Sequence, residues 1–143
     1  MIQSQLQRNK YLETTIQTAT PAQLLIMLCD GAIRFTRQGM EAIKEQRFED
    51  TNTNFLKTQD IINEFIITID RESPIAGNLL NLYDYFKMRL IEANTKKNIE
   101  PAEEVLGHLI DLKDTWIQAA KQYNQLAGQA SGSTPKTTHS SVV

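Results

Sequence analysis

Apolar residues recur every three or four positions in four separate stretches of the chain, which is the spacing of an amphipathic helix. The apolar face of the first stretch carries Leu25, Leu28, Ala32, Phe35, Gly39 and Ile43. The second aligns Phe48, Phe55, Ile62, Ile66 and Ile69, and the third aligns Ile75, Leu79, Leu82, Tyr83, Phe86, Leu90 and Ala93. The fourth carries Ala102, Val105, Leu109, Leu112, Trp116, Ala119 and Tyr123. Because no stretch alternates with the period of a strand, the pattern predicts an all-α protein.

Sequence signals for helix ends separate these stretches. Thr20-Pro21-Ala22-Gln23 combines an N-cap threonine, a first-turn proline and a glutamine that can complete a capping box, and this helix is expected to run to about residue 45. Ser73-Pro74 predicts the start of the third helix, and Pro101 the start of the fourth. Four helices with short connections predict an antiparallel up-down-up-down four-helix bundle.

The composition divides the chain into three parts. Residues 20–127 are expected to form the bundle. Residues 1–19 form an N-terminal arm, in which Tyr11, Leu12 and Ile16 are apolar at helical spacing and can fold back onto the bundle. Residues 128–143 are rich in Ser, Thr and Gly and poor in apolar residues, which predicts a disordered tail.

The helices carry more apolar residues than one core stripe needs. Flanking positions that helical phase places beside the core are Ile26, Ile33, Ile61, Phe65, Ile110 and Ile117. In a bundle each helix touches two neighbours, so a wide apolar stripe is expected, and core packing explains any single one of them. The alternative is that several flanks converge on an exposed groove that binds an amphipathic segment of a partner.

Charge and length exclude several classes of protein. The chain has 15 basic and 17 acidic residues and a net charge of −2, so it has no electrostatic signature of nucleic-acid binding. The apolar run from Leu24 ends at Asp30, which is too short for a membrane span, and the N-terminus has no secretory signal. The single cysteine, Cys29, excludes an intramolecular disulfide and is typical of the reducing cytoplasm.

Residue combinations typical of enzymes are missing. His108 has Glu104 and Asp111 nearby on the same helix, but a di-iron bundle needs Glu-x-x-His pairs, which the chain lacks. Cys29 has no basic neighbour or histidine partner and is interpreted as a small buried hydrophobe. With no phosphate-binding loop or nucleophile elbow either, we expect no enzyme activity, no cofactor and no metal site.

Three places in the sequence resemble a known family. The first is at the start of the first long helix, where Thr18-Ala19-Thr20-Pro21 leads into Asp30-Gly31-Ala32-Ile33-Arg34-Phe35. The second is in the third helix, where Leu82-Tyr83-Asp84-Tyr85 is followed by Arg89-Leu90 and Glu92-Ala93-Asn94. The third is Trp116, late in the fourth helix. In these residues the chain resembles the flagellin-specific secretion chaperones of bacteria, the FliS family. One departure is Cys29, where members usually carry tyrosine, and it affects the expected packing and hydrogen bonding around Asp30.

The resemblance implies a function. Members are antiparallel helical bundles that bind the C-terminal segment of flagellin in the cytoplasm, prevent its premature polymerisation and hold it for the flagellar export apparatus. It also implies that an N-terminal segment with a tyrosine covers part of the apolar site, and we assign this cap to Tyr11 and Ile16. We take the six flanking residues named above as groove candidates. A self-associating structural bundle, such as a homodimer without a client, is the alternative.

Overall fold

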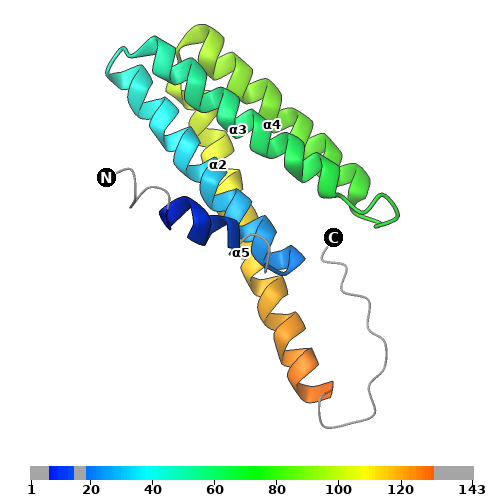
Figure 1. The fold of residues 1–143 in the computed structure, drawn as a ribbon. Helices are drawn as coiled ribbons and strands as arrows, with labels where there is room; N and C mark the ends of the chain where they lie inside the picture. Colours follow the sequence, from blue (N-terminus) through cyan, green and yellow to red (C-terminus); the bar gives the residue numbers. More distant parts are fainter. Residues whose placement is uncertain (1–6, 15–18, 131–143) are drawn as a thin grey trace.

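The computed structural model describes residues 7–14 and 19–130. Within these ranges a short helix spans residues 7–14, and four long helices follow: α2 (Pro21–Lys44), α3 (Phe48–Thr68), α4 (Ala76–Lys96) and α5 (Ile99–Ala130) (Figure 1). These ranges contain no strand. The prediction of an all-α protein is therefore confirmed.

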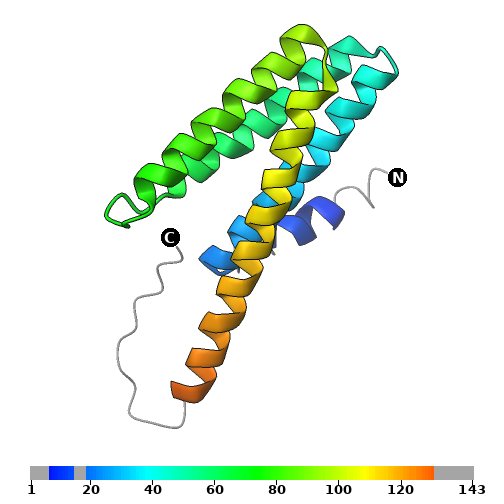
Figure 2. The same ribbon diagram turned by 180° about the vertical axis from the view of Figure 1, so that it is seen from behind.

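Successive long helices run in opposite directions and pack as a bundle. α2 packs against α3 and α5, and α4 packs against the same two helices. Figures 1 and 2 show that the α3–α4 pair is inclined to the α2–α5 pair, and that the pairs meet at the end that carries the α2–α3 and α4–α5 turns. At the opposite end, the last turns of α5 extend past the start of α2.

Two hydrogen bonds confirm the predicted start of α2. The Gln23 backbone N–H donates to Thr20 Oγ1 over 3.2 Å, and the Thr20 backbone N–H donates to Gln23 Oε1 over 3.0 Å. With Pro21 in the first turn, this is a complete capping box.

The predicted starts of the two later helices were misplaced by two residues. α4 begins at Ala76, because Ser73 and Pro74 belong to the preceding turn, where the Ser73 backbone N–H donates to the Asp70 carbonyl over 3.0 Å. α5 begins at Ile99, before Pro101, because Asn98 Oδ1 accepts the Glu100 backbone N–H over 3.2 Å and caps the helix.

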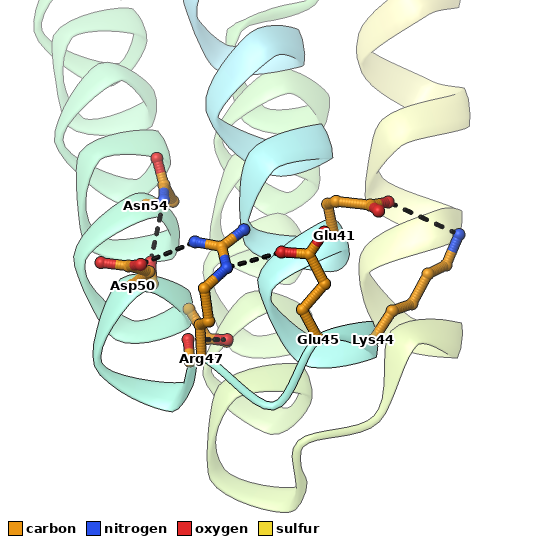
Figure 3. Close-up of polar contacts among 7 residues, drawn as sticks. Glu41, Lys44, Glu45, Arg47, Asp50 and Asn54 are labelled. Atoms are coloured by element: carbon orange, nitrogen blue, oxygen red, sulfur yellow. Dashed lines mark hydrogen bonds and ion pairs between the residues drawn. The ribbon is translucent and has the colours of Figure 1, made fainter.

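The α2–α3 turn is closed by backbone and side-chain bonds together. Gln46 adopts a left-handed φ of 59°, and the Arg47 backbone N–H donates to the Ala42 carbonyl over 2.8 Å, as in a Schellman motif. The Arg47 guanidinium donates to Glu45 and to Asp50, at 2.6 Å each (Figure 3). These two carboxylates raise the pKa of Arg47. The ion pairs are half-exposed, so the backbone bonds fix the turn and the arginine adds little.

α2 and α3 approach each other closely in the core. A Cβ on Gly39 would lie 2.4 Å from the ring of Phe55, which is fully buried. One turn away, the buried hydroxyls of Thr36 and Thr58 are hydrogen-bonded across the interface at 3.2 Å. A small residue and a paired polar contact therefore fix the separation and the register of these two helices.

The last helix is longer than its sequence pattern predicts. α5 continues to Ala130, beyond the boundary expected at residue 127, and all side chains of residues 121–128 are exposed. Tyr123, expected on the core face, is 46% exposed because α2 begins at Pro21 and no other long helix extends as far. The predicted disordered tail falls largely on residues 131–143, which lie outside the described residues.

Candidate functional site

A hollow of about 450 Å³ lies between α2 and α5, and we call it the α2–α5 groove. Its lining residues combine an apolar floor with charged walls: Asp30, Ile33, Arg34, Arg37, Gln38, Ile110, Lys113 and Asp114. The groove is open to solvent along one side, so its shape suits a segment of polypeptide more than a small enclosed ligand.

An ion pair marks the register of the two helices across this groove. Lys113 Nζ donates to Asp30 Oδ1 over 2.6 Å, and this carboxylate raises the pKa of Lys113. Because α2 and α5 are antiparallel, one turn forward from Asp30 corresponds to one turn back from Lys113. Ile33 therefore lies opposite Ile110, and both line the groove. In the other direction, this register places Ile26 opposite Ile117.

Four of the six predicted groove residues thus belong to one seam. Ile26, Ile110 and Ile117 are partly buried, and Ile33 is 8% exposed at the floor of the groove. Ile26 and Ile110 also pack against the core cluster. Partly buried apolar side chains therefore flank the Asp30–Lys113 pair on both sides.

The other two candidates lie elsewhere. Ile61 is partly buried on the α2–α3 side, where its Cδ1 lies 3.1 Å from the Cβ position of Gly31. Phe65 is 1% exposed, and its ring centroid lies 5.4 Å from that of Tyr83 in the core. Neither residue lines the α2–α5 groove, and Phe65 is reached by a partner only if the bundle opens.

Of the two expected cap residues, only Tyr11 lies in the described part of the chain. Its side chain is 71% exposed on the short helix of residues 7–14, and Tyr11 is not among the described residues that line the groove. Ile16 falls in residues 15–18, outside the described residues.

Several residues of the sequence motifs form a polar cluster between α4 and α5. Arg89 Nη1 donates to Glu92 over 2.6 Å and Arg89 Nε donates to Glu104 over 3.3 Å. A hydrogen bond from Tyr85 and the charge of Arg89 lower the pKa of Glu104, and the bond from Arg89 lowers the pKa of Glu92. These motif residues join two helices and lie away from the groove.

Cys29 and His108 show no arrangement for chemistry. Cys29 is fully buried, and burial raises the pKa of its thiol to about 12, so it stays protonated and inert. This confirms its interpretation as a small core hydrophobe. The ring of His108 lies 5.6 Å from that of Phe86. The described residues contain no cluster of three His, Cys, Asp or Glu side chains suited to a metal, and none of their helices could cross a membrane.

A second hollow, of about 410 Å³, was not expected from the sequence. It lies where the start of α2 meets the last turns of α5, and its walls include Pro21, Ala119, Tyr123 and Leu126. Tyr123 and Leu126 are 46% and 65% exposed. The overhang of α5 creates this surface, and the periodic pattern could not reveal it because the pattern does not show where neighbouring helices end.

Comparison with known proteins agrees with the residues that carry the resemblance. A family model described as "Flagellar protein FliS" matches residues 3–123, which include every residue of the α2–α5 groove. The chain is similar to the flagellar secretion chaperone FliS of Bacillus subtilis (strain 168), with 36% identity over 109 residues, or 76% of this chain and 82% of that relative. It is also similar to the flagellar secretion chaperone FliS of Salmonella typhimurium (strain LT2), with 34% identity over 117 residues, or 75% and 82%.

Proposed function

The chain belongs to the FliS family of flagellar proteins, and we propose that it binds the C-terminal segment of flagellin through the α2–α5 groove. By covering this segment in the cytoplasm, the protein prevents premature polymerisation and keeps flagellin competent for export. The observation that carries the proposal is the open α2–α5 groove, whose lining includes Ile33 and Ile110 beside the Asp30–Lys113 pair. The partly buried Ile26 and Ile117 lie on the other side of that pair.

Energetics require a long interface. Burying apolar surface contributes about 25 cal/mol per Å², while ordering a disordered client costs several kcal/mol. A single groove is too small to offset that cost with a wide margin. The client therefore extends beyond the groove, and the hollow beside Tyr123 and Leu126 at the end of α5 offers it a further apolar contact.

The bundle needs no chemical energy to hold or release such a client. Binding depends on burial and complementarity alone, so release follows when the export apparatus competes for the same segment. We therefore propose the export apparatus as a second binding partner. We also propose that the N-terminal arm, through Tyr11 and Ile16, covers apolar surface until the client arrives.

Calorimetric titration with two forms of flagellin tests the proposed function. Intact flagellin should bind with sub-micromolar affinity and a negative heat-capacity change, and flagellin without its C-terminal segment should not bind. If the folded protein binds neither form from the same bacterium, the proposal is wrong.

A pair of matched variants then tests the location. Ile117→Asp places a charge on the apolar seam, whereas Ile67→Asp places one on α3 at a side chain that is 72% exposed. We expect the first variant to weaken flagellin binding at least tenfold and the second to leave it unchanged. Equal effects would place the client on another face of the bundle.

Self-association is a second candidate, because α3 and α4 expose several large apolar side chains. Leu56, Met88 and Ile91 are 46%, 58% and 52% exposed. The hydrogen bond between Asn94 and Asn52, at 2.8 Å, sets the register of the two helices close to Leu56 and Ile91. Sedimentation equilibrium of the wild type and of Met88→Glu tests this surface: a homodimer formed through it dissociates in the variant, and a mass unchanged by the substitution excludes it.

A further inference from the structure

We propose that Arg34 and Arg37 bind carboxylate side chains of the segment seated in the α2–α5 groove, and so determine which acidic client sequence fits and in which register. The inference rests on the proposed function and adds the chemistry of the ligand. Both arginines line the groove, three residues apart on one side of α2, with Ile33 at the floor beside them.

The two arginines differ from the other arginines of the bundle interfaces. Arg47 contacts Glu45 and Asp50, and Arg89 contacts Glu92 and Glu104. Arg34 and Arg37, both exposed, form no ion pair with any residue in the described part of the chain. The guanidinium of Arg34 lies 4.9 Å from the centroid of the Phe35 ring, a contact that orients the side chain and leaves its charge unneutralised.

The Asp30–Lys113 pair explains why Arg34 has no carboxylate partner. Asp30 precedes Arg34 by four residues on α2, which is the favourable spacing and order for an ion pair within a helix. Lys113 from α5 binds the Asp30 carboxylate at 2.6 Å instead. The lysine therefore keeps Asp30 away from Arg34 and leaves the arginine available to a ligand.

The charge of the groove differs in sign from that of the whole protein. Three cations and two anions line it, while the chain has a net charge of −2. An acidic ligand is therefore repelled by the protein as a whole and attracted at this place. Arginine binds carboxylates with paired, directional hydrogen bonds, so the attraction also selects geometry.

The apolar floor identifies the ligand as a segment of polypeptide. Ile33 and Ile110 lie beside the arginines, and a small anion would gain nothing from contact with them. An amphipathic segment gains from both features when an apolar side chain covers the isoleucines and an Asp or Glu lies about one helical turn away.

Titration of wild-type, Arg34→Gln/Arg37→Gln and Arg71→Gln proteins with intact flagellin tests the inference. Arg71 lies exposed in the α3–α4 turn and provides a control that also removes positive charge. We expect the double variant to bind at least tenfold more weakly, and Arg71→Gln to bind like the wild type. Raising NaCl from about 50 to about 300 mM should weaken the wild type more than the double variant.

Client variants identify the paired carboxylate. Replacing each Asp or Glu of the flagellin segment by Asn or Gln should reveal at least one position that weakens binding to the wild type and has no further effect on the double variant. Far-ultraviolet circular dichroism and Trp116 fluorescence check folding, and Arg34→Lys/Arg37→Lys, which keeps the charge, should retain more affinity than the glutamine variant.

The outcomes separate the two proposals. If wild-type protein binds flagellin and the double glutamine variant binds equally well, the arginines have no role and the proposed function stands. If the wild type does not bind flagellin, the proposed function fails, and this inference fails with it.

Discussion

The two interfaces of α2 are built in opposite ways. Against α3, Gly39 lets the Phe55 ring approach closely, and the Thr36–Thr58 hydrogen bond lies fully buried. Against α5, the same helix leaves a hollow of about 450 Å³ that is lined by charged side chains above an isoleucine floor. One side of α2 is closed by complementary packing, and the other stays open.

This difference shows how one helix can serve both stability and binding. A well-packed interface loses stability when a single methyl group is added, because protein interiors have no spare volume. A substitution in an open groove leaves the protein folded, and it lowers the affinity for the client instead. The α2–α3 interface should therefore respond to mutation in unfolding experiments, and the α2–α5 groove in client titrations.

The largest expected loss of stability comes from Gly39→Ala. The added Cβ would lie 2.4 Å from the fully buried Phe55 ring, so the ring or the helices must shift to accommodate it. We expect a net destabilisation of about 1–3 kcal/mol, even though alanine favours helix formation. Urea denaturation followed by circular dichroism measures it.

Gly107→Ala is the matched control for that substitution. Gly107 is an exposed residue within α5, and a Cβ there would meet nothing within 4 Å. The substitution should stabilise the protein by about 0.5–1 kcal/mol through helix propensity alone. If both glycine variants are stabilised equally, α2 and α3 are not as closely packed as described.

The fold could be predicted from the sequence because helix periodicity and helix caps depend on residues close together in the chain. The 3.6-residue periodicity and the Thr20 capping box identified α2 correctly. The start of α4 was wrong because Ser73 and Pro74 are used in the preceding turn, a tertiary choice that the dipeptide does not reveal. Tyr123 was wrongly assigned to the core for a related reason, since helical phase does not show where the opposite helix ends.

The next largest loss of stability should come from replacing the buried hydroxyls of Thr36 and Thr58. Thr36 Oγ1 and Thr58 Oγ1 are 3.2 Å apart, and each also contacts a carbonyl of its own helix, of Ala32 and Asn54 respectively. Thr36→Val or Thr58→Val should each cost about 1 kcal/mol, because each removes a partner from the other hydroxyl. The double variant should cost less than the sum, and strict additivity would mean that the two hydroxyls do not interact.

The groove was less predictable than the core. Helical phase placed six isoleucine and phenylalanine residues on the flanks, but it did not show which neighbouring helix each flank faces. Ile33 and Ile110 line the α2–α5 groove, and the register of the two helices places Ile26 and Ile117 along the same seam. Ile61 instead faces α2 from α3, and Phe65 is buried. The Asp30–Lys113 pair, formed by residues far apart in sequence, could be found only from the structure.

Acid should weaken the α4–α5 interface by a smaller amount. Arg89 lowers the pKa of Glu92, and Tyr85 and Arg89 lower the pKa of Glu104. Carboxylates with a lower pKa in the folded state stabilise the protein above their unfolded pKa, near 4.5, and this contribution is lost as the pH falls through the folded pKa. The melting temperature of Glu92→Gln/Glu104→Gln should therefore fall less than that of the wild type below about pH 4.5. Parallel pH profiles of the two proteins would contradict this assignment.

Lys113→Met should have the smallest effect on stability and a clear effect on binding. The Asp30–Lys113 pair is partly exposed, so its loss should change the melting temperature less than either threonine variant does. Once unpaired, however, Asp30 can bind Arg34 four residues along α2 and occupy the arginine that we assign to the client. Flagellin binding should weaken in Lys113→Met, and Asp30→Asn/Lys113→Met should restore it. If the single variant binds normally, or the second substitution restores nothing, Lys113 does not keep Arg34 available, and the role of the arginines then depends on the glutamine variants alone.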